Sequence, residues 1–333
     1  MTKLIPIEPY ETAGLAVLEL LRQRAGQWLG IEVISKALGL TPTEVKRQIE
    51  LLQRVGHEIE VMPTYGYRLG GVIQQLRSEI IEYGLETEKA GKKVLVYDST
   101  ESTNDIAWHY AREKGYDGLA VFAEYQRAGR GRLGREWAAA RGSSILVSVL
   151  LQEDQGIGGQ ALTLLAGLAA AQAVEMACGL KLQIKWPNDV YYSGRKLAGT
   201  LVESRTRGGR IAYVVGIGIN CQQMPEDFPV PLRATAVSLR QATGQEVDRV
   251  GLARELLRQV DRWVGRLGEG QSKALHDEWL LRCDETGRKI TLMVNGQQFT
   301  GQVIDVCPEQ GLLLRLDNGA IKAFEGAACS VVR

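Results

Sequence analysis

The segment Gln126–Arg135 restricts the folding of this chain more than any other. Four arginines and three glycines occupy residues 127–135, and no acidic residue stands among them. Like charges repel one another, and a charge without a partner is costly to bury, so this segment cannot enter a core. It lies between two apolar stretches, 118–125 and 144–151, that are typical of buried strands. The chain must therefore form an exposed basic loop between two strands.

The composition of this loop indicates an anionic ligand. Glycine lets backbone N–H groups approach a phosphate closely, and arginine adds a fixed, bidentate charge. Because its four like charges repel one another, we expect the loop to be mobile when empty and to become ordered around an anion. It is not a P-loop, because no Gly-Lys-Ser/Thr follows. An RNA-binding Gly-Arg tract and a merely solvated loop are the alternatives, and the position between two apolar strands favours a site.

Length and composition limit the remaining possibilities. The chain has 333 residues, which predicts two or three domains at about 100–200 residues each. The 40 basic and 39 acidic residues give a net charge of +1, which excludes a strongly basic, histone-like protein but not a local basic patch. The first residues lack the long apolar run of a signal peptide, and we expect a cytoplasmic protein.

The most apolar stretch, 161–180, is rich in alanine and carries Thr163, Gln172 and Glu175. These polar residues favour a buried core helix over a membrane span, and we expect no membrane partner. The five cysteines are scattered and only three histidines are present, so the sequence contains no zinc-binding spacing. We expect reduced cysteines and no metal cluster.

Residues 1–70 are typical of a winged helix-turn-helix, with three helices followed by a hairpin. Apolar periodicity predicts helices at 11–29, at 32–38 and from Pro42 onward, with Thr41 as the cap of the third. The residues expected on the buried faces are Leu15, Leu18, Leu21 and Ala25 in the first helix and Val45, Ile49 and Leu52 in the third. Alternating residues around a turn at 63–66 predict the wing.

In a winged helix-turn-helix, the third helix enters the major groove of DNA. The side chains expected to face outward from it and bind DNA are Thr43, Lys46, Arg47 and Arg54. Residues 1–70 hold eight basic and eight acidic side chains, so this part of the chain has no net attraction for phosphate, and any basic face is narrow. DNA binding is the favoured interpretation. A helical packing module without a DNA partner is the alternative.

Residues 71–284 are predicted to form an α+β domain, a mixed sheet with helices packed on one side. A helix at 73–83 and a charged segment at 86–93 mark its beginning. Strands are expected at 93–97, 118–125, 144–151, 182–186, 190–192, 196–203 and 211–219. Helices are expected at 103–113, capped by Ser102 or Thr103, and at 159–178, 250–267 and 271–283.

Two further motifs in this domain carry candidate chemistry. Lys185-Trp-Pro-Asn-Asp189 contains a turn signal, and a turn between two strands is its simplest interpretation. Lys196 follows in a strand that continues with apolar residues, which constrains it more than a surface lysine. The strand 211–219 ends in Gly216-Ile-Gly-Ile-Asn220. A lone Gly-x-Gly is a weak signal, because the third glycine of a dinucleotide-binding fingerprint is missing.

Residues 285–333 are predicted to form a small domain of short strands, at 290–294, 298–306, 312–316 and 320–324. Asn295-Gly296 and Asn318-Gly319 are hairpin turn signals. A small β-barrel of the SH3-like kind fits this pattern.

Five motifs occur here in the order found in biotin protein ligases, and the chain resembles that family over nearly its whole length. They are Glu101-Ser-Thr-Asn104, Gly129-Arg-Gly-Arg-Leu-Gly-Arg135, Lys185-Trp-Pro-Asn-Asp189, Arg195-Lys-Leu-Ala-Gly199 and Gly216-Ile-Gly-Ile-Asn220. With the winged helix in front, the chain is similar to the bifunctional members, which are biotin operon repressors as well as biotin–[acetyl-CoA-carboxylase] ligases. The resemblance implies a class II synthetase-like catalytic domain and the C-terminal barrel.

The resemblance implies synthesis of biotinyl-5′-AMP from biotin and ATP with Mg²⁺, followed by transfer of biotin to a lysine of a biotin carboxyl carrier domain. Positive charge is needed where the carboxylate and the α-phosphate meet. The catalytic candidates are Lys196, Arg132 and Asp189, the last to orient or deprotonate the acceptor amine. The implied biotin-binding residues are Ser102, Thr103, Asn104, Gln126, Arg130, Gly131, Arg132 and Lys196. The implied residues for ATP or the adenylate are Gly129, Arg130, Arg132, Arg135, Trp137 and Asn220.

By the same resemblance, the adenylate-bound protein forms a homodimer through the central sheet and places two winged helices on a two-fold symmetric operator. Family members commonly have Ser-Arg-Thr/Ala-Ala at the start of the third helix, where this chain has Thr41-Pro-Thr-Glu44. An acid and a proline replace a cation and a small residue. This departure weakens the expectation of operator binding but does not affect ligation.

Three other interpretations compete with this one. A lipoate or octanoyl ligase shares the central fold but has a different glycine-rich signature. A ligand-sensing transcription factor with a degenerate ligase domain is disfavoured by the intact Lys196, Asp189 and loop arginines. A biotin ligase whose winged helix no longer binds DNA is the strongest of the three.

Overall fold

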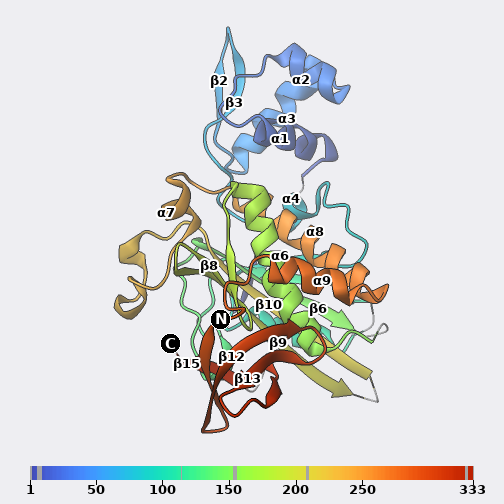
Figure 1. Cartoon of the computed structure of the whole chain (residues 1–333). Helices are drawn as coiled ribbons and strands as arrows, with labels where there is room; N and C mark the ends of the chain where they lie inside the picture. Colours follow the sequence, from blue (N-terminus) through green and yellow to red (C-terminus); the bar gives the residue numbers. More distant parts are fainter. Residues whose placement is uncertain are drawn as a thin grey trace.

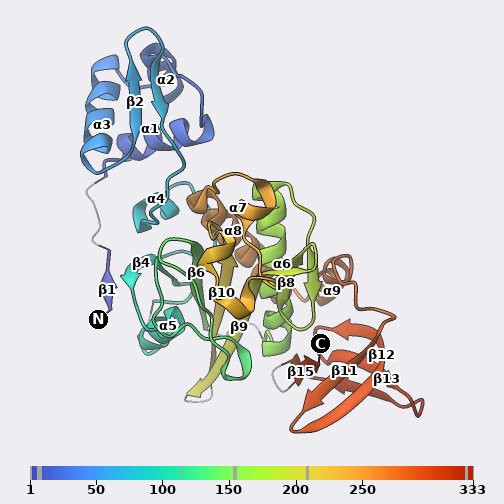
Figure 2. The same cartoon turned by 90° about the vertical axis from the view of Figure 1, so that its left-hand side faces the viewer.

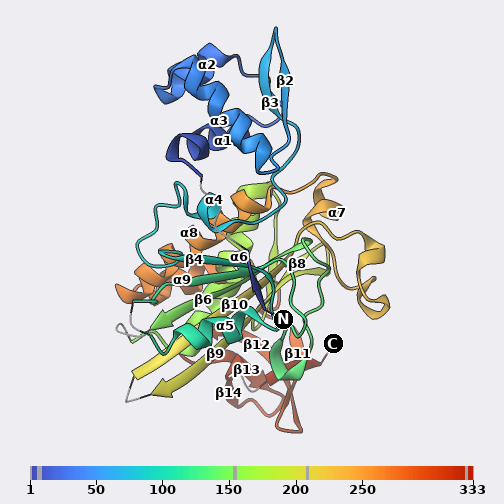
Figure 3. The same cartoon turned by 180° about the vertical axis from the view of Figure 1, so that it is seen from behind.

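The computed structural model describes residues 2–5, 10–113, 115–152, 156–207, 210–326 and 329–332. A helical unit with a hairpin stands at one end, a large sheet covered by helices forms the middle, and a smaller sheet ends the chain (Figure 1). Seen from behind, the helical unit again stands above the large sheet, next to α4 (Ser78–Glu82) and one end of α8 (Arg249–Gly268) (Figure 3).

Three helices and a hairpin form the N-terminal unit. They are α1 (Thr12–Gln23), α2 (Ile31–Leu38), α3 (Pro42–Arg54), β2 (Ile59–Met62) and β3 (Gly66–Leu69). The apolar faces of α1 and α3 meet in a core that is at most 2% exposed, made by Val17, Leu18, Leu21, Val45, Ile49 and Leu52. The first helix ends at Gln23, earlier than predicted, because Gly26 turns the chain at a φ of 79°. Ala25 is therefore exposed, contrary to the prediction.

The start of α3 is as predicted. Thr41 Oγ1 accepts a hydrogen bond from the backbone N–H of Glu44 at 3.2 Å. Pro42 occupies the first helical position, where a missing N–H costs nothing. Gly39, at a φ of 65°, makes the tight turn that separates α2 from α3.

Eight strands form the central sheet in the order β1-β4-β5-β6-β10-β9-β8-β7. Only β4 and β5 are parallel neighbours, so the sheet is mixed, as predicted. The strands are β1 (Lys3–Leu4), β4 (Val94–Ser99), β5 (Ala120–Ala123), β6 (Ser144–Gln152), β7 (Gln183–Lys185), β8 (Asp189–Tyr192), β9 (Arg195–Arg207) and β10 (Arg210–Asn220). The sequence does not predict β1, which pairs with β4 and so attaches the start of the chain to this sheet (Figure 2).

Helices cover both faces of the central sheet. On one face lie α6 (Gly159–Cys178), α8 and α9 (Ser272–Leu280), and on the other lies α5 (Thr103–Tyr110), with β6 and β10 between them (Figure 2). Adjacent residues of β10 show the division, since Val215 joins the large core while Val214 packs with Trp108 of α5. The prediction of helices on one side is therefore wrong for α5. This helix has only eight residues, too few for its apolar pattern to indicate a face.

Among the described residues, α6 is the one helix long and apolar enough to cross a membrane. Thirteen of its 20 residues are buried, and it packs against β9, β10 and α8. Its Gln172 Oε1 accepts a hydrogen bond from Trp263 Nε1 of α8 at 2.7 Å. It is the core helix that the sequence predicts.

Five strands form an antiparallel sheet near the C-terminus, in the order β14-β13-β12-β11-β15. They are β11 (Lys289–Val294), β12 (Gln297–Cys307), β13 (Gly311–Leu316), β14 (Ile321–Phe324) and β15 (Cys329–Val332). The first four lie where the sequence predicts them, and Asn295 and Gly296 make the predicted turn with φ angles of 48° and 82°. The short helix α7 (Leu239–Thr243) and β15 are not predicted by the sequence.

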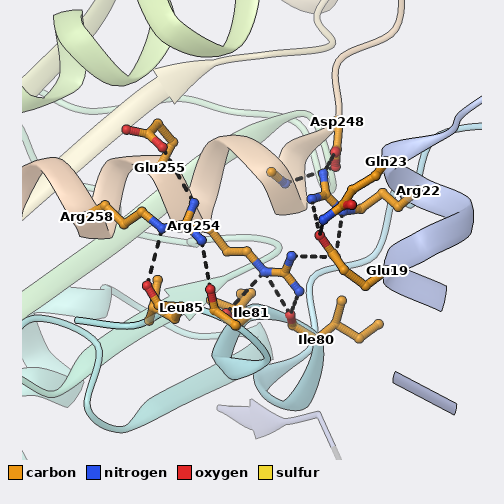
Figure 4. A network of polar contacts seen from close by, with 12 residues as sticks. Glu19, Arg22, Gln23, Ile80, Ile81, Leu85, Asp248, Arg254, Glu255 and Arg258 are labelled. Atoms are coloured by element: carbon orange, nitrogen blue, oxygen red, sulfur yellow. Dashed lines mark hydrogen bonds and ion pairs between the residues drawn. The ribbon is translucent and has the colours of Figure 1, made fainter. Parts of the chain in front are cut away.

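Ion pairs join the N-terminal unit to α8 (Figure 4). Glu19 of α1 lies 2.6 Å from Arg254 of α8 and 2.7 Å from Arg22 of its own helix. Arg22 also pairs with Asp248, whose side chain caps α8. Arg254 is 3% exposed and donates further hydrogen bonds to carbonyl oxygens of α4. Although burial opposes ionisation of Glu19, the hydrogen bonds from Arg22 and Arg254 lower its pKa to about 2.

We expect Glu19→Gln to loosen the N-terminal unit, because charge-assisted hydrogen bonds to Arg22 and Arg254 become weaker neutral ones. The cost is about 1–3 kcal/mol in the free energy that holds the unit in place. The rate of proteolytic cleavage within residues 70–77 measures this, with Glu50→Gln, exposed on α3, as the control.

The same contact has a defined pH dependence. A carboxyl group whose pKa is lowered by folding stabilises the folded state at pH values above its unperturbed pKa. The contribution of Glu19 is therefore complete above pH 4.5 and is lost as the pH falls toward 2.

Equal cleavage rates for Glu19→Gln and Glu50→Gln would show that the contacts of Glu19 do not hold the N-terminal unit in place.

Candidate functional site

A cavity of about 690 Å³ opens on the α5 face of the central sheet. Its floor consists of Gly199 on β9 and of Gly216 and Gly218 on β10. Gly218 lies opposite Gly199, and side chains two residues apart on a strand point the same way, so the missing side chains belong to one face. An added Cβ at Gly216 would lie 2.6 Å from Asn104 Oδ1, and one at Gly218 would lie 2.5 Å from the Trp137 indole. The cavity exists because these positions carry no side chain.

The cavity presents three environments along β10. Gly216 faces Asn104 of α5, Gly218 faces Trp137, and Asn220 ends the strand. Positions two residues apart are separated by about 7 Å. We call these environments the amide end, the centre and the far end. An elongated ligand that lies along β10 would meet them in this order.

The amide end is built at the start of α5. Thr103 donates from its N–H and its hydroxyl to Gln126 Oε1, at 2.7 and 3.0 Å. The hydroxyl of Ser148 on β6 lies 2.7 Å from Thr103 Oγ1 and 2.5 Å from Asn104 Oδ1. Asn104 Nδ2 is buried and has no hydrogen-bond partner within the described ranges. Ser102 holds the predicted N-cap position of α5 and lines the cavity, but its side chain makes no capping hydrogen bond.

The centre holds an ion pair beside an indole ring. Lys196 Nζ lies 2.7 Å from Asp189 Oδ1 and 5.6 Å from the centroid of the Trp137 ring. The backbone of Lys196 is hydrogen-bonded to Thr235 and Val237, which fixes the start of β9. The lysine side chain is 35% exposed. Lys196 is thus a positioned cation that an anionic ligand can reach.

The basic loop places Trp137 over the glycine floor. The backbone N–H of Trp137 donates to the carbonyl oxygen of Gly129 at 2.9 Å, and an added Cβ at Gly129 would lie 2.5 Å from the Trp137 carbonyl oxygen. The N–H of Gly131 donates to the carbonyl oxygen of Arg135 at 2.7 Å. Gly129 does not line the cavity, so its contribution is to admit this backbone contact.

Arg132 is turned toward the C-terminal sheet. Its guanidinium donates to the carbonyl oxygens of Gly326 and Cys329, the latter at 2.6 Å, and to Asn188 Oδ1 at 3.2 Å. Burial lowers the pKa of Arg132, while the nearby Asp189 carboxylate acts in the opposite direction. Arg132 therefore ties the basic loop to the end of the chain, and most of its donors are occupied by protein oxygens.

Acidic residues outside the loop pair with two more of its arginines. Arg130 makes two hydrogen bonds to Asp105 of α5, at 2.8 and 2.7 Å, which raise the pKa of Arg130 despite partial burial. Arg127 pairs with Glu101 at 2.7 Å. These carboxylates offset the repulsion among the arginines, on which the expectation of a mobile loop rests. Arg135 is exposed at the cavity rim.

Asn220 closes the far end. Its Nδ2 donates to the carbonyl oxygen of Val237 at 3.1 Å, and its Oδ1 accepts from Gln223 at 3.4 Å. The cavity thus gathers the predicted ligand-binding residues from four separate segments. Those that line it are Ser102, Thr103, Asn104, Gln126, Arg130, Gly131, Arg132, Arg135, Trp137, Asp189, Lys196 and Asn220.

Several lining or supporting residues are given no role by the sequence analysis. They are Ser148, Asn188, Gly199, Thr200, Glu203, Gly216 and Gly218, together with Met293 and Val331 of the C-terminal sheet. Two signals point to some of them. Gly216 and Gly218 alternate within a strand, which indicates one bare face, and Ser148 is the one polar residue in the apolar stretch 145–151. Met293 and Val331 have no local signal, because only the tertiary fold brings their sheet to the cavity.

The described part of the chain contains no group of three or more His, Cys, Asp or Glu side chains arranged to hold a metal ion. The carboxylates that line the cavity are Asp189 and Glu136, and Lys196 engages the first. Magnesium binds proteins through few carboxylates and the phosphates of its substrate. A magnesium ion would therefore enter this cavity as part of a phosphate-bearing ligand.

The predicted DNA-binding residues lie on the N-terminal unit, away from the cavity. Thr43, Lys46, Arg47 and Arg54 are all exposed on α3. Arg47, however, pairs with Glu11 and, at 2.7 Å, with Glu44. Arg68 of the hairpin pairs with Glu60 at 2.6 Å. The cations of α3 without a carboxylate partner in the described part of the chain are Lys46 and Arg54, so the basic face is narrow.

Known proteins similar to this chain share one activity in their names. Residues 96–220 match the Biotin/lipoate A/B protein ligase family. The chain is 34% identical over 313 residues to the Bifunctional ligase/repressor BirA of Bacillus subtilis, covering 92% of this chain and 95% of the relative. It is 30% identical to the protein of the same name from Escherichia coli, covering 96% and 97%. The fold matches a biotin protein ligase from Aquifex aeolicus in complex with biotin and ATP, with a TM-score of 0.63, 26% identity, and coverage of 73% and 99%.

The glycine floor makes a prediction about stability. Gly216→Ala brings a methyl group against Asn104 Oδ1, and overpacking of this kind costs about 1–3 kcal/mol. Gly265→Ala in α8 is the control, because no atom lies within 4 Å of its added Cβ and alanine favours a helix. The midpoint of urea denaturation should fall for Gly216→Ala and stay or rise for Gly265→Ala. If the midpoint fell in both variants or in neither, the claim that Gly216 packs tightly against Asn104 would be contradicted.

Proposed function

We propose that this chain, which belongs to the biotin protein ligase family, is a biotin–[acetyl-CoA-carboxylase] ligase that works at the cavity on β10. It forms biotinyl-5′-AMP from biotin and MgATP with release of pyrophosphate. It then passes biotin to a lysine of a carboxylase carrier domain with release of AMP. The name of a further relative, the Biotin--[acetyl-CoA-carboxylase] ligase of Paracoccus denitrificans, supports the reaction. The biotin and ATP bound in the Aquifex aeolicus structure support it as well.

One observation carries the proposal: the order of environments along β10. The amide end offers uncharged hydrogen-bonding groups, which suit the cyclic urea of biotin. The centre holds Lys196, where the carboxylate of biotin and the α-phosphate of ATP would meet. The far end holds the buried amide of Asn220, which suits a nucleobase edge. A ligand with a polar head, an acyl phosphate and an adenine fits this sequence of groups.

Lys196 supplies the charge for the first step. Attack of a carboxylate on the α-phosphate brings two anions together, so a positioned cation lowers the barrier. Asp189 holds the Lys196 ammonium at 2.7 Å and so keeps it in place over the floor. In the second step the nucleophile is a neutral lysine amine of the carrier domain, and we assign to the Asp189 carboxylate the role of orienting this amine or taking its proton.

The basic loop and the C-terminal sheet retain the intermediate. An acyl phosphate reacts with water, so a site that keeps it must exclude solvent. Gly131, Arg132 and Trp137 line one wall of the cavity, and Met293 and Val331 contribute from the C-terminal sheet. The hydrogen bonds from Arg132 to Gly326 and Cys329 hold these two walls together.

The proposal divides the chain into three domains, a winged helix-turn-helix at 1–70, the catalytic domain at 71–284 and an SH3-like barrel at 285–333. The helices and hairpin of the first and the antiparallel strands of the last support this division. In the bifunctional interpretation, the adenylate-bound protein is a cytoplasmic homodimer that represses biotin genes, as the repressor in the relatives' names suggests.

The competing proposal is a biotin ligase whose N-terminal unit no longer binds DNA. The neutralised Arg47 and Arg68 favour it, since phosphate binding needs unpaired cations. A gel shift with DNA from upstream of the biotin genes, with the adenylate present, separates the two. A shift abolished by Lys46→Ala together with Arg54→Ala supports the repressor, and no shift supports the ligase alone.

We expect Lys196→Ala to abolish the first half-reaction. Loss of one group that stabilises transition-state charge costs about 100-fold or more in rate. Biotin-dependent ATP–pyrophosphate exchange measures this, with the exposed Lys181→Ala as the control. The melting temperature should change little, because the Lys196 side chain is not buried. Normal exchange in Lys196→Ala would remove this lysine from the catalytic groups.

We expect Arg132→Gly to fold but to leak the adenylate, because the loop loses its bonds to Gly326 and Cys329. The measurement is the rate at which biotinyl-5′-AMP leaves the enzyme after a single turnover without carrier protein. The variant should release it faster than the wild type. Release at the wild-type rate would contradict the retaining role of this arginine.

A further inference from the structure

Ser148 is the one polar residue in the stretch 145–151 of β6, and it is completely buried. Its strand neighbours are Gly216 on β10 and Val121 on β5. Because Gly216 has no side chain, Asn104 of α5 can reach down to Ser148 across the floor of the cavity. None of the reaction steps proposed above uses this hydroxyl.

The distances at Ser148 define how the amide of Asn104 is turned. A serine hydroxyl has one proton to donate, and a side-chain amide oxygen can only accept. Two oxygens lie within reach of this proton, Thr103 Oγ1 at 2.7 Å and Asn104 Oδ1 at 2.5 Å, and the amide oxygen is the nearer. Ser148 Oγ and Asn104 Oδ1 are 2.5 Å apart, which matches an O–H···O hydrogen bond and is too short for an N–H···O bond. The oxygen of Asn104 therefore faces Ser148, and Nδ2 points away from it.

The opposite side of this amide is directed at the ligand. Asn104 lines the cavity, and its Nδ2 is buried without a hydrogen-bond partner in the described ranges. A buried donor without a partner is unfavourable, so a ligand that brings an acceptor to this point binds better than one that brings a donor.

We propose that Ser148 is a positioning residue for substrate selection. It holds the amide of Asn104 with its N–H groups toward the cavity, so that the amide end selects the carbonyl of a cyclic urea and rejects a donor in the same place. This inference rests on the proposed function, because it takes biotin as the ligand. Ser148 does not touch the substrate and acts through Asn104.

The probe is 2-iminobiotin, in which an imino group replaces the carbonyl oxygen of the urea. At neutral pH this group is a protonated guanidinium, which can only donate hydrogen bonds. Wild-type protein should bind biotin and reject 2-iminobiotin. In Ser148→Ala the amide of Asn104 loses its anchor and can turn over to present Oδ1, so rejection weakens.

Titration calorimetry without ATP gives the affinities of both compounds. Ser148→Ala should weaken biotin binding about tenfold, as expected for the loss of one hydrogen bond. The ratio of the affinities for biotin and 2-iminobiotin should fall by at least the same factor. Ser143→Ala is the matched control, since this buried hydroxyl donates to the carbonyl oxygen of Ala140 and does not line the cavity. It should keep both affinities.

Asn104→Asp tests the inference independently of how well Ser148→Ala folds. The aspartate keeps an acceptor for Ser148 and replaces the cavity-facing donor by a second acceptor, so the preference should shift toward 2-iminobiotin. Unchanged affinity and preference in Ser148→Ala, or an unchanged preference in Asn104→Asp, would overturn the inference while leaving the ligase proposal intact. Absence of biotin binding by the wild-type protein would instead overturn the proposed function.

Discussion

The site depends on a patch of sheet surface without side chains. Most sheet faces in a domain are covered by apolar side chains, and α6 covers one face of this sheet in that way. On the other face, Gly199, Gly216 and Gly218 leave a hollow that packing cannot close. What surrounds the hollow must then be held by polar contacts: Thr103 to Gln126, Ser148 to Asn104, and Lys196 to Asp189. These contacts give the cavity its order of environments, and the proposed chemistry follows from that order.

Ion pairs hold the parts of the molecule in place around this hollow. Helix α8 carries two buried arginines five residues apart, Arg249 and Arg254. Arg249 binds Glu124 at 2.6 Å and the carbonyl oxygen of Ser144 at 2.9 Å, which fixes the strands that lead into the amide end and the basic loop. Arg254 binds Glu19 of the N-terminal unit. One helix therefore supports both the cavity and the unit that a repressor would use to bind DNA.

Much of the fold and of the site could be predicted from local patterns. The cap at Thr41, the long core helix α6 and the strands around the basic loop follow from periodicity, propensity and burial. The predicted ligand-binding residues follow from the resemblance to one family, and all of them except Gly129 line the cavity. The features that could not be predicted depend on contacts between segments that are far apart in the sequence. The carboxylates that neutralise Arg130 and the carbonyl oxygens that bind Arg132 come from segments that only the tertiary fold brings near. The same holds for β1, a strand of two residues, and for the face on which α5 packs.

The most direct test of the central claim is ATP–pyrophosphate exchange by the purified protein, with biotin, lipoate and octanoate compared as substrates. The order of groups along β10 predicts exchange that depends on biotin and is absent with the other two acids, because the ligand proposed for the amide end is a cyclic urea. Exchange with lipoate or octanoate but not biotin would contradict that assignment. Absence of exchange with all three acids would contradict the claim that Lys196 and its surroundings form an adenylating site.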